Sequence, residues 1–151
     1  VVFRSTQYLN DADAQAIAVY LRALPQRAIA PAEVVKPSAA TLERGAKVYE
    51  QHCAQCHGDN GEGKPGAFPA LAGNRAVVLQ DPTNLVRVVL QGGYLPATAG
   101  NPRPHGMPPF MQVLGDDDVA AVSTFVRNAW GNQAPAVGTI GVYRARERRG
   151  S

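Results

Sequence analysis

Residues 53–57 read Cys53-Ala54-Gln55-Cys56-His57, and the spacing of these two thiols and the imidazole limits the folds that the chain can adopt. C-x-x-C-H is the spacing of c-type haem attachment. Two thiols three positions apart at the end of a helical turn can add to the two vinyl groups of a haem, and the next imidazole then lies under the iron. Cys53, Cys56 and His57 therefore predict one covalently bound haem, with His57 as its proximal ligand.

A redox pair and a zinc site are alternatives for the two cysteines, and both fit the sequence less well. A thioredoxin-like redox pair needs a βαβ context, which the residue pattern does not offer. A zinc site needs further ligands at a suitable spacing, and the remaining histidines are only His52 and His105. A chance occurrence of the motif is the third alternative, and the residues that follow the motif argue against it.

The turn after the motif supplies a partner for the imidazole. A metal-ligating histidine usually donates its other ring N–H to a carboxylate or a carbonyl. The residues Phe68-Pro69-Ala70-Leu71 predict a rigid turn in which the Pro69 carbonyl accepts this hydrogen bond. Leu71 is then expected to pack on the haem edge.

The residue pattern predicts an all-α protein, because no segment has the periodicity of a convincing strand. Helix-capping residues and apolar periodicity mark the expected helices. Their ranges are 10–24, 38–53, a short one over 75–80, 81–92 and 116–131, with an ordered, proline-rich loop over 94–110.

These features resemble the class I cytochrome c family. The residues that carry the resemblance are Gly45, Tyr49, Cys53, Cys56, His57, Pro69 and Leu71. The resemblance implies the class I fold around a single haem, with an extra N-terminal helix in this chain. It also implies that Gly45 lets the last helix cross closely, with Phe125 facing it.

The sixth iron ligand must come from far along the chain, and Met107, Met111 and His105 are the candidates. Residues 106–110, Gly-Met-Pro-Pro-Phe, resemble the family's Met-Pro ligand loop before the closing helix. The resemblance implies Met107 as the ligand and leaves Met111 as a gap-filling core residue. His/Met ligation raises the reduction potential relative to bis-His ligation. Because it saturates the iron, we expect an electron carrier rather than an enzyme; a haem enzyme or gas sensor with an open iron is the less favoured alternative.

Two further groups of side chains are expected around the haem. Apolar residues that would cover its faces are Leu71, Leu85, Val89 and Phe110, and candidate donors to its propionates are Lys64, Asn74 and Arg75.

Most of the chain is similar to the cytochrome c subunits of bacterial membrane-bound dehydrogenases, such as alcohol and gluconate dehydrogenases. The similar segments are 13–25, 45–63, 71–74, 81–92 and 107–132. The resemblance implies that electrons pass from a dehydrogenase subunit to a quinone or another cytochrome. It also implies a place in the periplasm or on the periplasmic face of the inner membrane, with peripheral membrane association through the parent complex. An independent soluble monohaem cytochrome is the alternative.

An internal repeat concerns the first expected helix. Leu9, Ile17, Tyr20, Leu21 and Arg22 recur in one constant register as Leu114, Val122, Phe125, Val126 and Arg127. Any two capped amphipathic helices share some likeness, but the matching aromatic and arginine positions favour a true repeat. We interpret residues 1–25 as the closing helix of a preceding cytochrome-like domain. A linker over 26–37, a cytochrome c domain over 38–132 and a basic tail over 133–151 then follow.

The overall composition sets outer limits on function. A chain of 151 residues with a net charge of +3 fits one globular domain with appendages, and no apolar run is long enough to span a membrane. Part of the positive charge lies at the end of the chain, in Arg144, Arg146, Arg148 and Arg149. These arginines have no interleaved aromatic residues, so we expect a solvated tail or a docking strip for an acidic protein rather than nucleic-acid binding.

Overall fold

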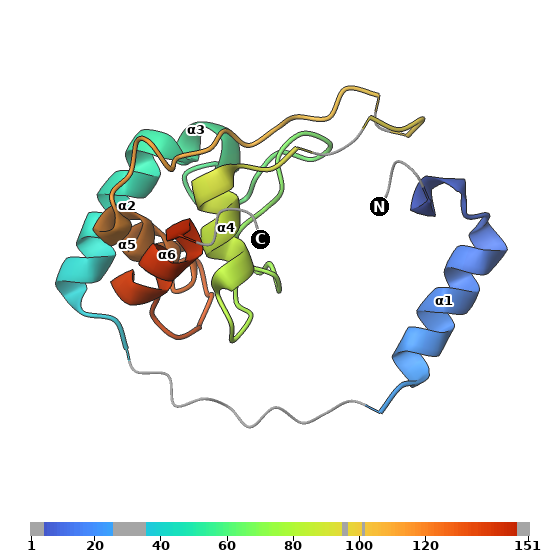
Figure 1. The fold of residues 1–151 in the computed structure, drawn as a ribbon, viewed down its shortest axis with the longest axis horizontal. Helices are drawn as coiled ribbons and strands as arrows, with labels where there is room; N and C mark the ends of the chain where they lie inside the picture. Colours follow the sequence, from blue (N-terminus) through green and yellow to red (C-terminus); the bar gives the residue numbers. More distant parts are fainter. Residues whose placement is uncertain (1–4, 26–35, 95–96, 101, 148–151) are drawn as a thin grey trace. The chain divides into compact units, whose positions relative to one another are not determined.

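The computed structural model describes residues 5–25, 36–94, 97–100 and 102–147. Within these ranges all regular structure is helical, apart from two isolated bridges. The elements are η2 (Thr6–Tyr8), α1 (Asp11–Ala23), α2 (Ala39–His52), α3 (Ala54–His57), α4 (Thr83–Gln91), α5 (Asp116–Val126) and α6 (Thr139–Glu147) (Figure 1). The all-α class that the sequence predicts is confirmed. One compact unit contains α1, and the other contains α2 to α6.

Short polar side chains begin α1 and α2 where the sequence placed them. The Asn10 side chain accepts a hydrogen bond from the Asp13 N–H at 2.7 Å, and Ser38 accepts one from the Thr41 N–H at 3.1 Å. Each bond satisfies a backbone donor that has no partner within the helix. The starts of α1 and α2 therefore follow from local side-chain chemistry.

The prediction of a short helix over residues 75–80 is wrong, because the chain forms turns and bends there. The Asn74 side chain accepts a hydrogen bond from the Ala76 N–H at 2.9 Å, and the Val77 N–H donates to the Asn74 carbonyl at 3.0 Å. An asparagine side chain that binds the backbone two residues on offers the chain a turn in place of a helix. This local competition explains the difference.

Helices α2 and α5 pack against each other at Gly45. A Cβ atom on Gly45 would lie 2.7 Å from the Phe125 Cβ and would also overlap the Ala121 carbonyl. One turn further along α2, the Tyr49 ring packs on Phe125 and Trp130, with ring centroids 5.5 and 4.9 Å apart. The close approach of Gly45 to Phe125 that the family resemblance implied is present.

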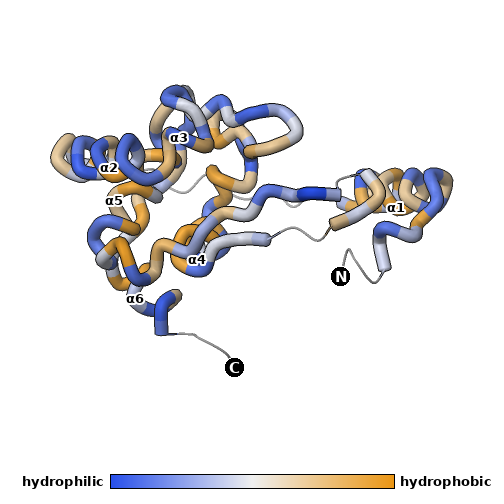
Figure 2. The backbone as a smooth tube through the Cα atoms, turned by 90° about the horizontal axis from the view of Figure 1, so that it is seen from above, coloured by the Kyte–Doolittle hydropathy of each residue, from blue (hydrophilic) through white to orange (hydrophobic). Residues whose placement is uncertain are grey.

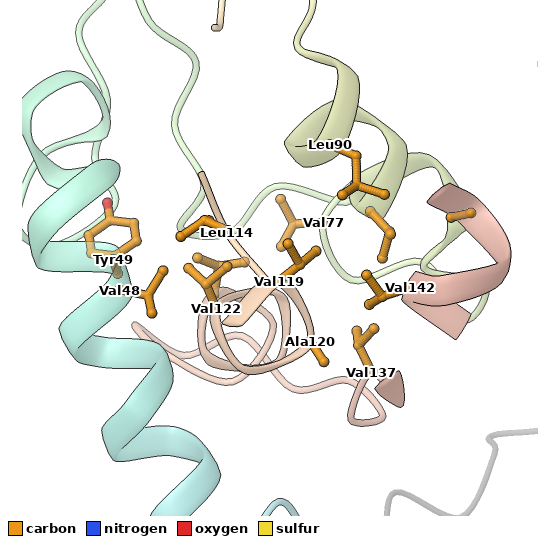
Figure 3. Packing of buried hydrophobic residues seen from close by; sticks show 13 residues of the cluster. Val48, Tyr49, Val77, Leu90, Leu114, Val119, Ala120, Val122, Val137 and Val142 are labelled. Atoms are coloured by element: carbon orange, nitrogen blue, oxygen red, sulfur yellow. The ribbon is translucent and has the colours of Figure 1, made fainter. Parts of the chain in front are cut away.

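The core lies around this crossing. Figure 3 shows Val48 of α2 directed toward Val122 of α5, with Leu90 and Val142 on the other side of α5. Most of the buried apolar residues are valine and alanine. Because these side chains are small, the helices must approach closely to fill the interior. Among the described residues, no helix combines the length and the apolar composition that crossing a membrane requires.

Helix α6 lies within the segment that we expected to be a basic tail. Val142 is fully buried and Ala145 nearly so, and α6 packs on α4 and α5. Residues 139–147 contain few apolar side chains, and their arginines dominate the local pattern, so the sequence did not predict a helix here. Arg144 is exposed, whereas Arg148 and Arg149 lie outside the described residues.

Helix α1 has no buried residue of its own. Ile17, Tyr20 and Leu21, three apolar residues of the internal repeat, are each about half exposed or more. Figure 2 shows apolar and polar stretches alternating along α1. The expected linker over 26–37 falls almost entirely outside the described residues.

We predict that Gly45→Ala lowers the free energy of unfolding by about 2 kcal/mol or more, since the new methyl group overpacks the α2–α5 contact. The matched control is Gly141→Ala in α6, where a Cβ would meet open space. That change should raise stability by up to about 1 kcal/mol, because alanine favours the helix. Denaturant unfolding of both variants measures the difference, and equal effects would contradict the close approach at Gly45.

Candidate functional site

The C-x-x-C-H motif lies at the junction of α2 and α3. Cys53 ends α2, and its carbonyl accepts hydrogen bonds from the Cys56 and His57 N–H groups at 3.1 and 3.0 Å. This tight turn places both cysteines and His57 within a single helical turn. Both thiols are free and only partly buried, so an external group has access to them.

The ionisation of Cys53 argues against a thioredoxin-like redox pair. Burial, with a smaller effect of the Cys56 charge, raises the pKa of the Cys53 thiol to about 11. Redox-active C-x-x-C motifs depend on a thiol whose pKa is lowered. The Cys53 environment has the opposite effect.

The imidazole of His57 is held in one orientation. Its side chain is buried, and its Nδ1 lies 3.0 Å from the Pro69 carbonyl oxygen. The carbonyl can only accept, so Nδ1 carries the proton and donates it, and Nε2 is left with a free lone pair. A ligating imidazole requires a hydrogen-bond partner of this kind behind it. The contact with Pro69 is the one that the sequence predicted.

The loop that carries Pro69 is closed on itself by backbone hydrogen bonds. The Gly63 N–H donates to the His57 carbonyl at 2.7 Å, and the Leu71 N–H donates to the Gly61 carbonyl at 2.7 Å. Gly63 has φ of +66°, and a Cβ there would lie 2.6 Å from the Phe68 carbonyl oxygen. A glycine is therefore needed where the loop returns toward His57.

Asn132 joins the Leu71 turn to the end of α5. Its side chain is buried; Nδ2 donates to the Leu71 and Val126 carbonyls at 3.0 and 2.7 Å, and Oδ1 accepts from the Gly73 N–H at 3.0 Å. The sequence offered only the resemblance of the 130–132 segment as a signal for this residue. These three hydrogen bonds of the Asn132 amide fix the position of Leu71 relative to the end of α5.

The loop with Met107 is fastened to the end of α4. Met107 and Gly93 exchange two backbone hydrogen bonds, of 2.8 and 3.1 Å. The Phe110 and Met111 N–H groups donate to carbonyls of α4, at 3.1 and 3.0 Å. Met107 and Met111 are both half-buried, whereas His105 is exposed with its ring against Phe68, 4.9 Å between centroids.

The donor set and its surroundings fit a haem. Two free thiols, an imidazole with a free Nε2 and the thioethers of Met107 and Met111 are the donor types that c-type cytochromes use. Apolar side chains pack against the core but stay half exposed, so a flat apolar group would find a surface to cover. They are Leu71, Val78, Leu85, Val89 and Phe110.

The sequence pattern of the cytochrome c family matches residues 42–130. The chain belongs to the cytochrome c family. The matched range contains the C-x-x-C-H motif, the Pro69 turn, the Met107 loop and α5. Family membership implies a covalent haem.

Relatives of this cytochrome c domain include subunits of larger dehydrogenases. The cytochrome c subunit of a quinone alcohol dehydrogenase from Gluconacetobacter polyoxogenes is 40% identical over 93% of this chain and 31% of its own length. The cytochrome c subunit of gluconate 2-dehydrogenase from Pantoea cypripedii is 35% identical over 92% of this chain and 34% of its own length. The chain thus spans about a third of these subunits. Cytochrome c-552 of Thermus thermophilus is 38% identical, over 58% of this chain and 69% of its own length.

The three expected propionate donors differ in their surroundings. Both ends of the Asn74 amide are engaged, since Nδ2 donates to the Ala70 carbonyl at 2.9 Å and Oδ1 accepts from the Ala76 N–H at 2.9 Å. Asn74 therefore shapes its own turn. Lys64 and Arg75 are exposed, and their role stays a prediction.

Arg127 has a buried structural role that its sequence position did not indicate. It is fully buried, and Nη1 donates to the Val77 and Leu79 carbonyls at 2.7 and 2.8 Å while Nε donates to the Pro135 carbonyl at 3.0 Å. Burial lowers the pKa of its guanidinium, and the charge of Asp81 opposes that effect. Arg127 thereby holds the segment before α4 against the end of α5.

We predict that Asn132→Ala lowers the free energy of unfolding by roughly 2 to 4 kcal/mol, because it leaves several buried backbone groups without partners. The control is Asn84→Ala, at an exposed position of α4, which should change stability little. Denaturant unfolding measures both. A small effect of Asn132→Ala would show that the Leu71 turn does not depend on this amide.

Proposed function

We propose that this cytochrome c domain transfers single electrons through one covalent haem. The haem would be attached through Cys53 and Cys56, with His57 and Met107 as its axial ligands. The hydrogen bond from His57 Nδ1 to the Pro69 carbonyl is the observation that carries the proposal, because it fixes the proton on Nδ1 and leaves the Nε2 lone pair free for iron. Two accessible thiols in the same helical turn supply the attachment points.

A bound haem supplies a reversible one-electron change between ferrous and ferric iron. His57 and Met107 would both bind the iron and leave it no open position for a substrate, which would make the domain a carrier and not a catalyst. Leu71 would pack on the haem edge, and Val89 and Phe110 would cover its face. Apolar cover disfavours the extra charge of the ferric form and so raises the reduction potential.

The names of the relatives support a place in a dehydrogenase complex. The alcohol and gluconate enzymes each have a cytochrome c subunit, and more than nine tenths of this chain resembles a part of that subunit. We propose that the parent protein receives electrons from a dehydrogenase subunit and passes them to a quinone or another cytochrome. It would do so in the periplasm, or on the periplasmic face of the inner membrane through its complex.

We predict that Met107→Ala opens the iron to carbon monoxide and lowers the midpoint potential by at least about 100 mV, since axial ligands tune haem potentials over roughly 0.8 V. Met111→Ala is the matched control and should change neither property. Carbon monoxide titration of the reduced protein and redox titration measure both. Rapid carbon monoxide binding by the unaltered protein would favour the haem enzyme or gas sensor, and an effect of Met111→Ala alone would transfer the ligand role to Met111.

We further propose that α1 is the closing helix of a preceding cytochrome-like domain. Ile17, Tyr20 and Leu21 occupy the positions that correspond to Val122, Phe125 and Val126 of α5. In α5 these positions are buried or half-buried, whereas in α1 they are exposed. Their natural partner would be a helix with a glycine at the crossing, as α2 has at Gly45. The remaining boundaries would be the linker over 26–37, the haem domain over 38–132 and a C-terminal segment over 133–151.

The full-length parent protein tests this assignment. We predict that Ile17→Asp lowers the unfolding temperature of the preceding domain, because it places a charge in the helix crossing. Ala12→Asp is the control, since Ala12 corresponds to the exposed Asp117 of α5. Differential scanning calorimetry separates the domains. Identical melting profiles for the two variants would contradict the assignment.

A further inference from the structure

Helix α6 lies beyond residues 42–130, which match the family, so the family pattern assigns it no role. It is nevertheless anchored firmly, because Val142 and Ala145 are buried against the domain. The orientation that these two residues impose directs one side chain, Arg146, onto the segment that follows Met107. Arg144, on the same helix, is exposed.

Arg146 uses all three nitrogens of its guanidinium on this segment. Nε donates to the Asp116 carboxylate at 2.7 Å, Nη1 to the Met111 carbonyl at 2.5 Å, and Nη2 to the Leu114 carbonyl at 3.0 Å. The Arg146 and Asp116 side chains are only 23% and 25% exposed, so the ion pair is partly shielded from solvent. A rigid planar fork can satisfy three acceptors at once, which a lysine ammonium on a flexible stem cannot do in the same geometry.

The three acceptors lie where the Met107 loop passes into α5. Met111 follows Met107 closely in the chain, and Asp116 is the first residue of α5. The loop is held on its other side by α4 and Gly93, through the backbone bonds of Met107, Phe110 and Met111. Backbone hydrogen bonds to α4 and Gly93 hold one side of the loop, and the Arg146 guanidinium holds the other.

We infer that Arg146 is a positioning residue for Met107, keeping the ligand loop closed so that the thioether stays on the iron. This inference rests on the proposed His57/Met107 ligation. A thioether is a weak donor. Its bond to iron therefore lasts only while the loop holds Met107 in place. Removing the fork raises the population of the open loop, and an exogenous ligand then competes more easily for the iron.

Imidazole titration of the oxidised, haem-containing protein tests the inference. Binding is followed by loss of the methionine-to-iron charge-transfer band at the red end of the visible spectrum. Arg146→Ala should bind imidazole about tenfold more tightly than the parent, in proportion to the larger open fraction. Arg146→Lys should lie between the two. Arg144→Ala should match the parent.

A second control separates positioning from general stability. Val126→Ala, at the buried end of α5 opposite Asp116, should lower the unfolding temperature without changing imidazole affinity well below that temperature. If Arg146→Ala lowers only the unfolding temperature and leaves imidazole affinity at the parent value, Arg146 is merely structural and the inference fails.

Failure of the proposed methionine ligation, and failure of Arg146→Ala to fold, can each be told apart from a merely structural role of Arg146. Absence of the charge-transfer band in the parent protein would overturn the proposed methionine ligation, and the inference with it. If Arg146→Ala does not fold, Arg146→Lys and Asp116→Asn decide, because both keep a polar partner in place. Each should tighten imidazole binding by at least about threefold. Parent-like binding by both variants would overturn the positioning role of Arg146 and leave the proposed methionine ligation standing.

Discussion

Helices α2 and α5 meet at Gly45, and this crossing positions both sides of the candidate haem site. No side chain larger than hydrogen fits between the Gly45 backbone, the Ala121 carbonyl and Phe125. The contact fixes the end of α2, and therefore the place of the cysteines and His57. It also fixes the position of α5 at Ala121 and Phe125, and the methionine loop joins α5 at Asp116. A different distance between the two helices would shift His57 relative to the segment that joins Met107 to α5.

Backbone carbonyls, rather than side-chain pairs, complete the site. The Pro69 carbonyl orients His57, and the amide of Asn132 binds the Leu71 carbonyl. Arg127 does the same for Val77 and Leu79. Loops with little regular structure expose many such carbonyls, and a buried polar side chain that binds several of them gives an irregular segment one defined path.

Much of the fold and the centre of the site could be predicted from local sequence. Caps at Asn10 and Ser38 mark helix starts, and the hydrogen bond of His57 to Pro69 follows from the rigid turn that the residues encode. The helix predicted at 75–80 is absent because the Asn74 side chain competes with helical bonding. Helix α6 was not predicted because only two of its side chains, Val142 and Ala145, are buried, and two positions do not make a recognisable pattern.

The donor chemistry of this protein, the chain positions of most of its helices and its family follow from the sequence alone. Those properties reside in short segments, where the spacing of a few residues fixes which groups can act together. The packing of α6 on the domain, and the grip of Arg127, Asn132 and Arg146 on its loops, arise only in the folded chain. Most of their partners are backbone carbonyls far away in the chain, and every residue has a carbonyl. No residue type therefore marks in the sequence which carbonyl a buried arginine or asparagine will bind.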